Sequence, residues 1–444
     1  MKKRLLTMLA LLANVVLAAV AQDTPAITFE GSAGVERTIT VGVAAAGTIK
    51  VDWGDGTLVS KEATTAYDLK WDENGVDFTG TPTGTVKIYA DGIVAFDGAG
   101  KFNDDKTDIP NALTAIDVTG APDLVNLYLN ANKISSIDLS KNTQLVKLNI
   151  ANNNIAAIEL SAQVALTTFT ANDNQLSALD LSKNVALTTV TLSNNKLTTL
   201  DFTNNPLIKT FTVLNNELTA VTFGANTTKN HTIQFGGNKL TGIDLTGFTT
   251  YSGTYLRLRD NNISNAADII LPGTINQLWA DGNALSLSEL YALKSKAKTL
   301  TYATLFESEQ AQQPYAIAES IEVNGTVDLS SQAKLGETAT NFVWKNAEGT
   351  ALVEGTDYTV ADGVFTFLTT QEAIHCEMTN AEFPLFTAEK PYMTTVMKVE
   401  GGGTGIRTIA ADKAQGVWYN LKGQRVDAPT KGLYIVNGVK VVIK

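Results

Sequence analysis

Cysteine and histidine are almost missing from this chain of 444 residues, which has one cysteine, Cys376, and two histidines, His231 and His375. A single cysteine excludes an intrachain disulfide framework. The same scarcity excludes a cysteine-rich zinc site and a histidine-based metal cluster. We therefore expect Cys376 to be a small buried strand residue, and we predict neither a metal nor a cofactor.

Positive charge and aromatic residues are also scarce. The net charge is -11, and aromatic residues make up 7% of the chain. An acidic surface with few aromatics repels nucleic-acid phosphates and anionic lipid headgroups. Beyond the N-terminal apolar run, no stretch approaches the ~20 apolar residues that a membrane-spanning helix needs. The sequence thus predicts no nucleic-acid partner and no membrane insertion.

Motifs of catalysis are the third absence. The chain has no G-x-S-x-G, no H-E-x-x-H, no phosphate-binding loop and no Cys–His dyad. Carboxylates are frequent in any acidic chain, and they indicate a glycosidase only where two of them face each other across a cleft at ~5–9 Å. We predict that the protein is not an enzyme. Two alternatives stay open, a polysaccharide-acting enzyme and a purely structural surface scaffold.

Residues 1–21 have the three parts of a secretory signal peptide. Lys2-Lys3-Arg4 is the basic start, residues 5–20 are the apolar run, and Ala19-Val20-Ala21 is a small-x-small cleavage site. Cleavage would leave a net charge of about -14, because these residues contain three cations and no acid. The rival interpretation is an uncleaved membrane anchor. We predict a secreted or outer-surface protein, cleaved near Ala21.

An asparagine recurs along the middle of the chain in one sequence frame. Its eight copies are spaced by 21, 21, 21, 21, 22, 23 and 22 residues: Asn132, Asn153, Asn174, Asn195, Asn216, Asn238, Asn261 and Asn283. The frame, for example Leu145-x-x-Leu148-x-Ile150-x-x-Asn153, resembles the leucine-rich repeat. This resemblance implies a mainly β solenoid of stacked units, which we place at residues 84–300.

The recurrent asparagines are predicted to be structural rather than functional. After each short strand the chain turns sharply, which leaves buried backbone groups without sheet partners. An amide side chain donates and accepts hydrogen bonds, so it satisfies groups on its own turn and on the next. An ionised aspartate cannot donate, and Asp91 in Val86-x-Ile88-x-x-Asp91-x-Ile93 is therefore predicted to mark an atypical unit outside the regular stack. We interpret residues 84–123 as degenerate entry turns, with Leu113-x-x-Ile116-x-Val118 as half a repeat.

Acidic residues also recur in the part of each repeat that follows the asparagine and returns to the next strand, which we call the reverse leg. They are Asp117, Asp138, Glu159, Asp180 and Asp201. Two interpretations fit this column of carboxylates. It is either a ladder that binds cations or a set of local turn formers. In the second case each carboxylate accepts from backbone N–H groups in the turn that follows it.

The outward residues of the repeat strands should line the concave face, which solenoids commonly use for binding. Through the middle these residues are Thr and Asn, but the last units bring large side chains that are typical of binding hot spots. The candidate ligand-binding residues are Tyr255, Arg257, Arg259, Gln277, Trp279 and Asp281, with Tyr128 alone near the start. The expected ligand is an extracellular protein or a glycan, bound by a monomer.

Short strands flank the predicted solenoid. In residues 22–83, Asp52-Trp53-Gly54-Asp55-Gly56-Thr57 resembles the W-G-D-G signature of PKD-like β-sandwiches. Asp52 and Asp55 are there either Ca²⁺ ligands or turn formers. Residues 286–289, Ser-Leu-Ser-Glu, have a capping-box pattern, which predicts a short helix that caps the solenoid.

The C-terminal third is predicted to contain two further modules. In residues 301–400, Trp344 and Cys376 lie 32 residues apart on predicted strands and resemble the buried pair of an Ig-like sandwich. A repeat domain followed by such a module is similar to internalin-like surface proteins. Residues 401–444 begin with a Gly-rich linker. Their G-Q-R-V and G-L-Y-I-V-N-G order resembles the C-terminal sorting domain of Bacteroidetes type IX secretion, or else forms a plain β tail of two hairpins, the second turning on Asn437-Gly438.

Overall fold

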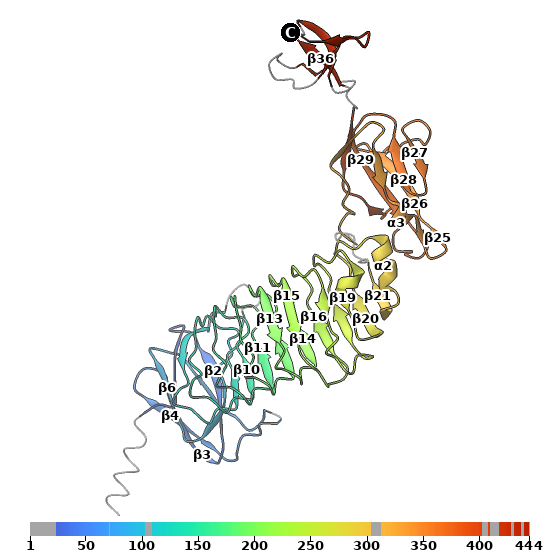
Figure 1. Cartoon of the computed structure of the whole chain (residues 1–444). Coiled ribbons are helices and arrows are strands. Elements are labelled where there is room, and N and C mark those ends of the chain that lie inside the picture. Colours follow the sequence, from blue (N-terminus) through green and yellow to red (C-terminus); the bar gives the residue numbers. More distant parts are fainter. Residues whose placement is uncertain are drawn as a thin grey trace, which may run out of the picture. The chain divides into compact units, whose positions relative to one another are not determined.

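The computed structural model describes residues 24–70, 72–102, 109–302, 312–401, 407–408, 417–427, 430–436 and 439–443. The predicted signal peptide, most of the Gly-rich linker and Asn437-Gly438 lie outside the described residues. The chain divides into two compact units, Met1–Asn283 with Leu293–Tyr302, and Ala284–Ala292 with Ala303–Lys444. Among the described residues, no helix is long and apolar enough to cross a membrane. The fold is mainly β, as predicted (Figure 1).

The first unit opens with two sheets that share a core. Phe29 of one sheet and Phe96 of the other have their ring centroids 6.3 Å apart. The five-stranded sheet has the order β4-β3-β6-β1-β8, and β7, β2 and β5 end a twelve-stranded sheet. The strands are β1 (Ile27–Gly31), β2 (Arg37–Val43), β3 (Gly47–Asp52), β4 (Leu58–Ala63), β5 (Val76–Gly80), β6 (Val86–Tyr89), β7 (Ile93–Asp97) and β8 (Leu113–Asp117).

The turn after β3 is built by its own carboxylates. Asp52 Oδ1 accepts from the N–H groups of Gly54 and Gly56 at 2.8 and 2.9 Å, and Asp55 Oδ1 accepts from Thr57 at 2.7 Å. Both glycines have positive φ, of 100° and 81°, a region that glycine enters without steric cost. Both carboxylates therefore act as turn formers.

The solenoid begins one strand later than the sequence frame predicts. We predicted that Val86 and Ile88 start a degenerate repeat, but β6 pairs antiparallel with β1 and β3. The chain then reverses at Asp91-Gly92, where Gly92 has φ of 58°, and β7 becomes the first strand parallel to a repeat strand, with Phe96 opposite Leu127. The error arose because alternating apolar residues fit either a hairpin or a repeat over so short a stretch.

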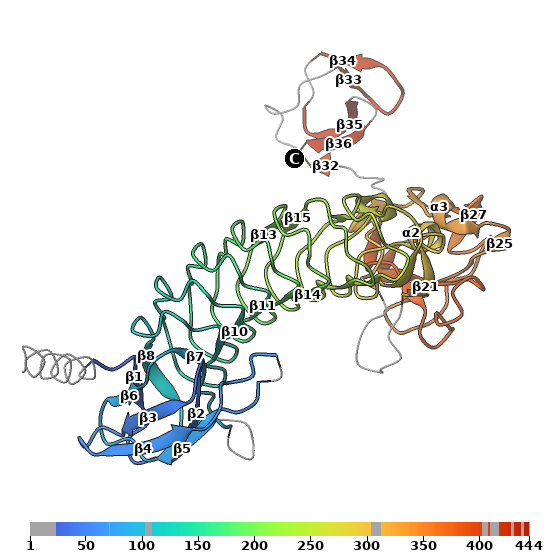
Figure 2. The same cartoon turned by 90° about the horizontal axis from the view of Figure 1, so that it is seen from below.

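From β9 onward each repeat contributes one parallel strand to the twelve-stranded sheet. The successive strands are β9 (Asn126–Tyr128), β10 (Lys147–Asn149), β11 (Thr168–Thr170), β12 (Thr189–Thr191), β14 (Thr210–Thr212), β16 (Thr232–Gln234), β18 (Tyr255–Arg257) and β20 (Ile275–Trp279). Four short strands form two separate pairs outside this sheet: β13 (Thr199–Phe202) with β15 (Ala220–Phe223), and β17 (Ile243–Asp244) with β19 (Ile269–Ile270), the last preceded by the 3-10 turn η1 (Ala266–Asp268). Figure 2 shows β13 and β15 on the side of the coil opposite β11 and β14.

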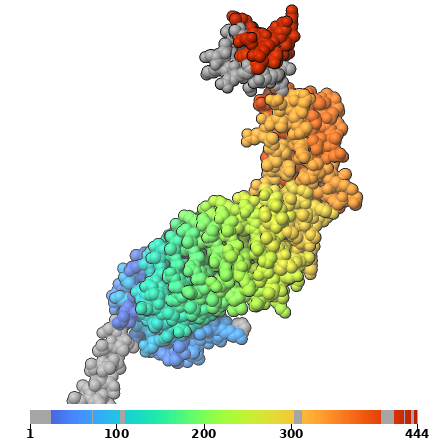
Figure 3. Space-filling model, in the orientation of Figure 1, coloured from blue at the N-terminus to red at the C-terminus, as the bar shows by residue number. Residues whose placement is uncertain are grey.

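The middle residue of every repeat strand points into the core. These residues stack in register and are at most 1% exposed: Leu127, Leu148, Phe169, Val190, Phe211, Ile233, Leu256 and Leu278. No single repeat unit could bury such residues alone. Each unit, or rung of the stack, is therefore stable only when it packs against the units on either side. In the space-filling view the colours of this unit accordingly change gradually along the stack (Figure 3).

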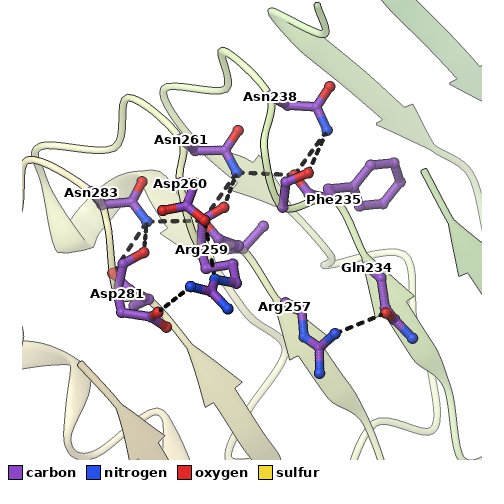
Figure 4. Close-up of polar contacts among 12 residues, drawn as sticks. Gln234, Phe235, Asn238, Arg257, Arg259, Asp260, Asn261, Asp281 and Asn283 are labelled. Atoms are coloured by element: carbon purple, nitrogen blue, oxygen red, sulfur yellow. Dashed lines mark hydrogen bonds and ion pairs between the residues drawn. The ribbon is translucent and has the colours of Figure 1, made fainter. Parts of the chain in front are cut away.

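The structure confirms the structural role of all eight asparagines. In each case Oδ1 accepts from a backbone N–H of the preceding unit, at 2.7–3.1 Å. The amide nitrogen donates to carbonyls of its own turn and of the preceding unit, as Figure 4 shows for Asn261 and Asn283. The ladder thus satisfies backbone groups that the sharp turn removes from the sheet.

The sheet continues for one strand beyond the last asparagine. The predicted helix α2 (Leu287–Leu293) is present, and Ser286 Oγ accepts from the Glu289 N–H at 3.2 Å, which makes Ser286 its N-cap. The chain then forms β21 (Ala297–Thr301), which pairs parallel with β20. The sequence frame did not predict this strand, since it carries no asparagine and none of the repeat spacing.

The second unit is built mainly of short strands between residues 320 and 400. One sheet has the order β22-β31-β29-β26 with β30 on β29, another has the order β23-β28-β27, and β24 pairs with β25. The elements are β22 (Ser320–Glu322), β23 (Thr326–Asp328), α3 (Ser330–Ala333), β24 (Lys334–Leu335), β25 (Thr338–Ala339), β26 (Asn341–Asn346), β27 (Tyr358–Ala361), β28 (Val364–Phe367), β29 (Gln371–Thr379), β30 (Tyr392–Met393) and β31 (Met397–Glu400).

Trp344 and Cys376 meet as predicted. They lie directly opposite each other on β26 and β29, and neither is exposed. Trp344 also contacts Phe367 of the other sheet, edge to face, with ring centroids 4.8 Å apart. Burial raises the pKa of the Cys376 thiol, so this cysteine is a packing residue rather than a nucleophile.

The C-terminal residues form a small sheet of order β32-β36-β35-β33-β34. Both predicted hairpins are present, β33 with β34 and β35 with β36. Trp418 and Val441 are buried in this sheet, with Tyr434 packed against them. The strands are β32 (Arg407–Thr408), β33 (Trp418–Tyr419), β34 (Arg425–Val426), β35 (Gly432–Val436) and β36 (Val439–Ile443).

Candidate binding surface

Two columns of side chains cover the outward face of the parallel sheet. The first column contains Asn126, Lys147, Thr168, Thr189, Thr210, Thr232, Tyr255 and Gln277. The second contains Tyr128, Asn149, Thr170, Thr191, Thr212, Gln234, Arg257 and Trp279. The register therefore places large side chains at both ends of the face and threonines in the middle.

At the C-terminal end these side chains enclose a recess. It has a volume of about 290 Å³ and is lined by Thr232, Gln234, Tyr255, Arg257 and Trp279. The rings of Tyr255 and Trp279 are tilted by 32°, with centroids 6.4 Å apart. Tyr255 is 42% exposed. The recess thus offers two aromatic walls that a ligand can reach.

Arg257 joins the aromatic and polar sides of the recess. Its guanidinium carbon lies 5.0 Å from the centre of the Trp279 ring, within the range of a cation–π contact. Its Nη1 donates to Gln234 Oε1 at 3.3 Å (Figure 4). These two contacts hold the guanidinium plane in place while leaving most of its five N–H donors for other acceptors.

Arg259 and Asp281, which we predicted to share this surface, are engaged with each other instead. Arg259 Nη2 lies 3.4 Å from Asp281 Oδ2, and Arg259 Nε lies 3.0 Å from Asp260 Oδ2 (Figure 4). Asp281 is 1% exposed. Its inclusion as a ligand-binding residue is wrong, because it follows the end of β20 and its side chain turns into the protein.

Tyr128 lies at the other end of the face and is half-buried by a loop that precedes β5. The loop carboxylate Asp72 accepts from Asn126 Nδ2 at 2.6 Å and lies 2.7 Å from Lys147 Nζ. Burial, together with the nearby Asp72 carboxylate, raises the pKa of Tyr128. The structure therefore does not bring Tyr128 together with the other candidates.

Sequence reasoning missed Thr232 and Gln234 in the recess and Asp72 at the far end. The signal for Gln234 was available, since it occupies the outward position of the repeat before Arg257. No local pattern pointed to Asp72, because its partners Asn126 and Lys147 lie 54 and 75 residues away in sequence. Gln277, which sequence reasoning did include, neighbours Tyr255 in register but does not line the recess.

The acidic column on the reverse leg consists of turn formers. Each carboxylate accepts from the backbone N–H two residues later, at 2.8–2.9 Å, and Asp244 repeats the pattern. These hydrogen bonds lower the pKa of Asp138, Glu159 and Asp180. Across the described ranges, no three His, Cys, Asp or Glu residues are grouped so that they could hold a metal ion.

No protein-family model and no curated protein matches the chain. Among solved structures, the chain is similar to the functional domain of InlJ from Listeria monocytogenes, with 16% identity and a TM-score of 0.43, over 66% of each chain. It is also similar to the leucine-rich repeat domain of APL1B, with 17% identity and a TM-score of 0.34, over 56% of this chain and 82% of that one.

A third similar structure is the internalin inlF from Listeria monocytogenes, with 17% identity and a TM-score of 0.24, over 47% of this chain and 79% of that one. The chain spans 66% of the length of the InlJ domain. At these identities the likeness concerns the fold alone. The stacked parallel strands and the asparagine ladder by themselves describe the first unit as a β-solenoid with the leucine-rich-repeat frame.

Proposed function

We propose that the protein is a non-catalytic binding protein, exported to the cell surface or the medium, that holds an extracellular protein or glycan. The observation that carries this proposal is the recess between Tyr255 and Trp279, with Arg257 across it. Tyr, Trp and Arg dominate binding hot spots because they give large, rigid contact areas with polar groups attached. A solenoid also presents such residues on a broad and regular face.

Between the two ligand classes, the recess favours a protein. A sugar stacks best on a flat, open aromatic ring, whereas Trp279 is half-buried and Arg257 lies over its ring. Mixed aromatic, amide and cationic groups instead suit the varied side chains of a polypeptide. No carboxylate lines the recess, so the paired acids that a glycosidase needs are not found there.

The flanking modules complete this proposal. We infer a PKD-like module in residues 22–83, an Ig-like module in residues 301–400, and a sorting segment in residues 401–444 after signal cleavage near Ala21. Support for the Ig-like module comes from the Trp344–Cys376 pair and the two sheets packed around it. Support for the sorting segment comes from its two hairpins.

The test compares the full mature chain with a double variant, Trp279→Ala with Arg257→Ala, in pull-downs of extracellular proteins and on a glycan array. We expect the double variant to lose binding while its thermal melting stays unchanged. The matched control, Thr189→Ala with Thr191→Ala, removes two side chains from the middle of the same face and should keep binding. If the wild type binds nothing, the chain is a structural scaffold and the proposal is wrong.

A further inference from the structure

Arg257 is the cation of the recess, and it has no carboxylate partner among the described residues. Its contacts are the Gln234 amide oxygen and the face of Trp279. Arg259, two residues later, is paired with both Asp260 and Asp281. A guanidinium presents its donors as a rigid fork that matches a carboxylate with two parallel hydrogen bonds. Arg257 thus retains donors suited to an acidic group from outside.

The opposite end of the same face shows how it accepts such a group. There the chain places its own carboxylate, Asp72, on the outward face, where Asn126 Nδ2 and Lys147 Nζ donate to it. Burial alone would raise the pKa of Asp72, but the hydrogen bond and the charge of Lys147, together with the hydrogen bond from Asn126, lower it below its ordinary value. A carboxylate on a polypeptide loop is therefore stable on this sheet.

The two ends carry comparable groups, but in exchanged columns: Lys147 and Asn126 stand in the first column with Tyr128 in the second, whereas Arg257 and Gln234 stand in the second with Tyr255 in the first. At the first end a cation, an amide and a tyrosine surround Asp72, and at the second end Arg257, Gln234 and Tyr255 surround open space. The second end also has Trp279, whose indole gives an apolar contact area that is missing at the end where Asp72 lies. The positive charge of Arg257 and the example of Asp72 both indicate the same occupant for the recess, a carboxylate on a polypeptide.

We propose that the recess is a carboxylate site, in which Arg257 holds the Asp or Glu side chain of an extended segment of a partner protein between Tyr255 and Trp279. This inference rests on the proposed function and deepens it. Arg257 and Gln234 give the site its charge preference, and the two rings pack against residues that flank the acid. An acidic sugar offers the same charge but is a different occupant, which the test separates.

The test uses the full chain labelled with 5-fluorotryptophan and observed by fluorine NMR. The Trp279 resonance is identified as the one that disappears in Trp279→Phe. Three probes are titrated into the millimolar range: N-acetyl-Tyr-Glu-Thr amide, the same peptide with Gln for Glu, and methyl glucuronide. We expect a saturable shift with the Glu peptide, about tenfold weaker binding of the Gln peptide, and weaker binding as salt screens the charge.

Variants assign the effect to the guanidinium. Arg257→Gln should bind both peptides equally weakly, and Arg257→Lys should keep part of the preference, because it keeps the charge but loses the fork. Lys183→Gln removes the same charge from an exposed turn of the reverse leg and should behave as wild type. Circular dichroism melting of each variant confirms folding.

Three results would overturn the inference: equal binding of the Glu and Gln peptides, no saturable shift with the Glu peptide, or tighter binding of the glucuronide than of the Glu peptide. Its failure is distinct from that of the proposed function. If a partner found by pull-down requires Trp279 but binds Arg257→Gln normally, the proposed function stands and carboxylate recognition is wrong.

Discussion

At the scale of single residues, the solenoid depends on side-chain amides that hydrogen-bond to backbone groups lacking a partner in the sheet. Asn195 shows the arrangement: its Oδ1 accepts from Leu176 N at 2.9 Å, and its Nδ2 donates to the carbonyls of Ala171 and Leu192 at 2.9 and 3.0 Å. A second ladder runs along the reverse leg, where buried amides donate to carbonyls of preceding units: Asn142, Gln163, Asn184 and Asn205. Sequence reasoning did not find it, since Gln163 breaks the asparagine pattern.

Replacement of Asn195 tests the need for a group that both donates and accepts. Asn195→Ala leaves buried backbone groups unpaired and should lower the free energy of unfolding by ~1–3 kcal/mol. Asn195→Asp should be at least as destabilising at neutral pH, because an ionised carboxylate cannot donate to Ala171 and Leu192. Urea unfolding measures both. Asn204→Ala, the same change at an exposed turn position, is the control, and an equal loss there would contradict the argument.

At the scale of elements, alternation and turn chemistry predicted most strands, because those signals are local. Asp362 and Gly363 have φ of 50° and 80° and form the hairpin turn between β27 and β28, where Asp and Gly are the residues that turn chemistry favours. The sequence contains a further local pattern, at the residue before each asparagine of the ladder, from which we made no prediction. The residue before each ladder asparagine has positive φ, and apart from Ala131 it is always Asn, Asp or Gly, the residues that enter this region most readily.

Contacts between segments far apart in the sequence could not be predicted from such local patterns. β21 joins the sheet through its pairing with β20, and the Asp72 loop is fixed by repeats that follow it in sequence. The alternation of inward and outward residues placed Tyr255, Arg257 and Trp279 on the outward face, where the structure has them. It failed at Asp281, because the strand ends at Trp279 and the inward-outward pattern ends with it.

The turn between β15 and β16 is an element held by one buried histidine. His231 is unexposed; its Nε2 lies 3.1 Å from Asn226 Oδ1 and its Nδ1 lies 3.2 Å from Thr254 Oγ1. The ring also packs edge to face on Phe248 at 4.7 Å. Burial, aided by the charge of Lys209, lowers the pKa of His231, so the folded protein keeps this ring neutral at a pH where the unfolded chain protonates it.

Stability should consequently fall as the solution is acidified past the ordinary histidine pKa of about 6.5. The folded pKa is lower than the unfolded one, so the unfolded state binds more protons and the free energy of unfolding decreases from about pH 7.5 to about 5.5. Carboxylates with lowered pKa values contribute only at a more acidic pH. The measurement is urea unfolding across this range. His231→Gln should be less stable at neutral pH but lose the slope, and an unchanged slope would contradict this assignment.

At the scale of the whole molecule, the first unit is a stack in which each rung contacts only its neighbours. Its stability is therefore close to a sum over rungs and the interfaces between them. One consequence is that the length of the stack and the chemistry of the recess are separable. The recess is built from β16, β18 and β20, whereas β11 and β12 contribute only threonines to the outward face.

Deletion of one complete rung tests this independence. Removal of the 21 residues 168–188 joins Thr167 to Thr189 in the same frame, so that β12 takes the place of β11 beside β10. We expect a folded chain that is less stable, because one interface is lost, and has a smaller urea m-value, because less surface is exposed on unfolding. Its binding to any ligand of the recess should equal that of the wild type.

The control deletion removes one residue fewer, residues 168–187. It shifts the frame by one, which turns Val190 outward and places threonine in the core column. That chain should lose its cooperative transition. If both deletions unfold the first unit, the rungs are coupled over longer distances than nearest neighbours. If the 21-residue deletion folds but loses binding, the recess depends on the length of the stack as well as on its own three strands.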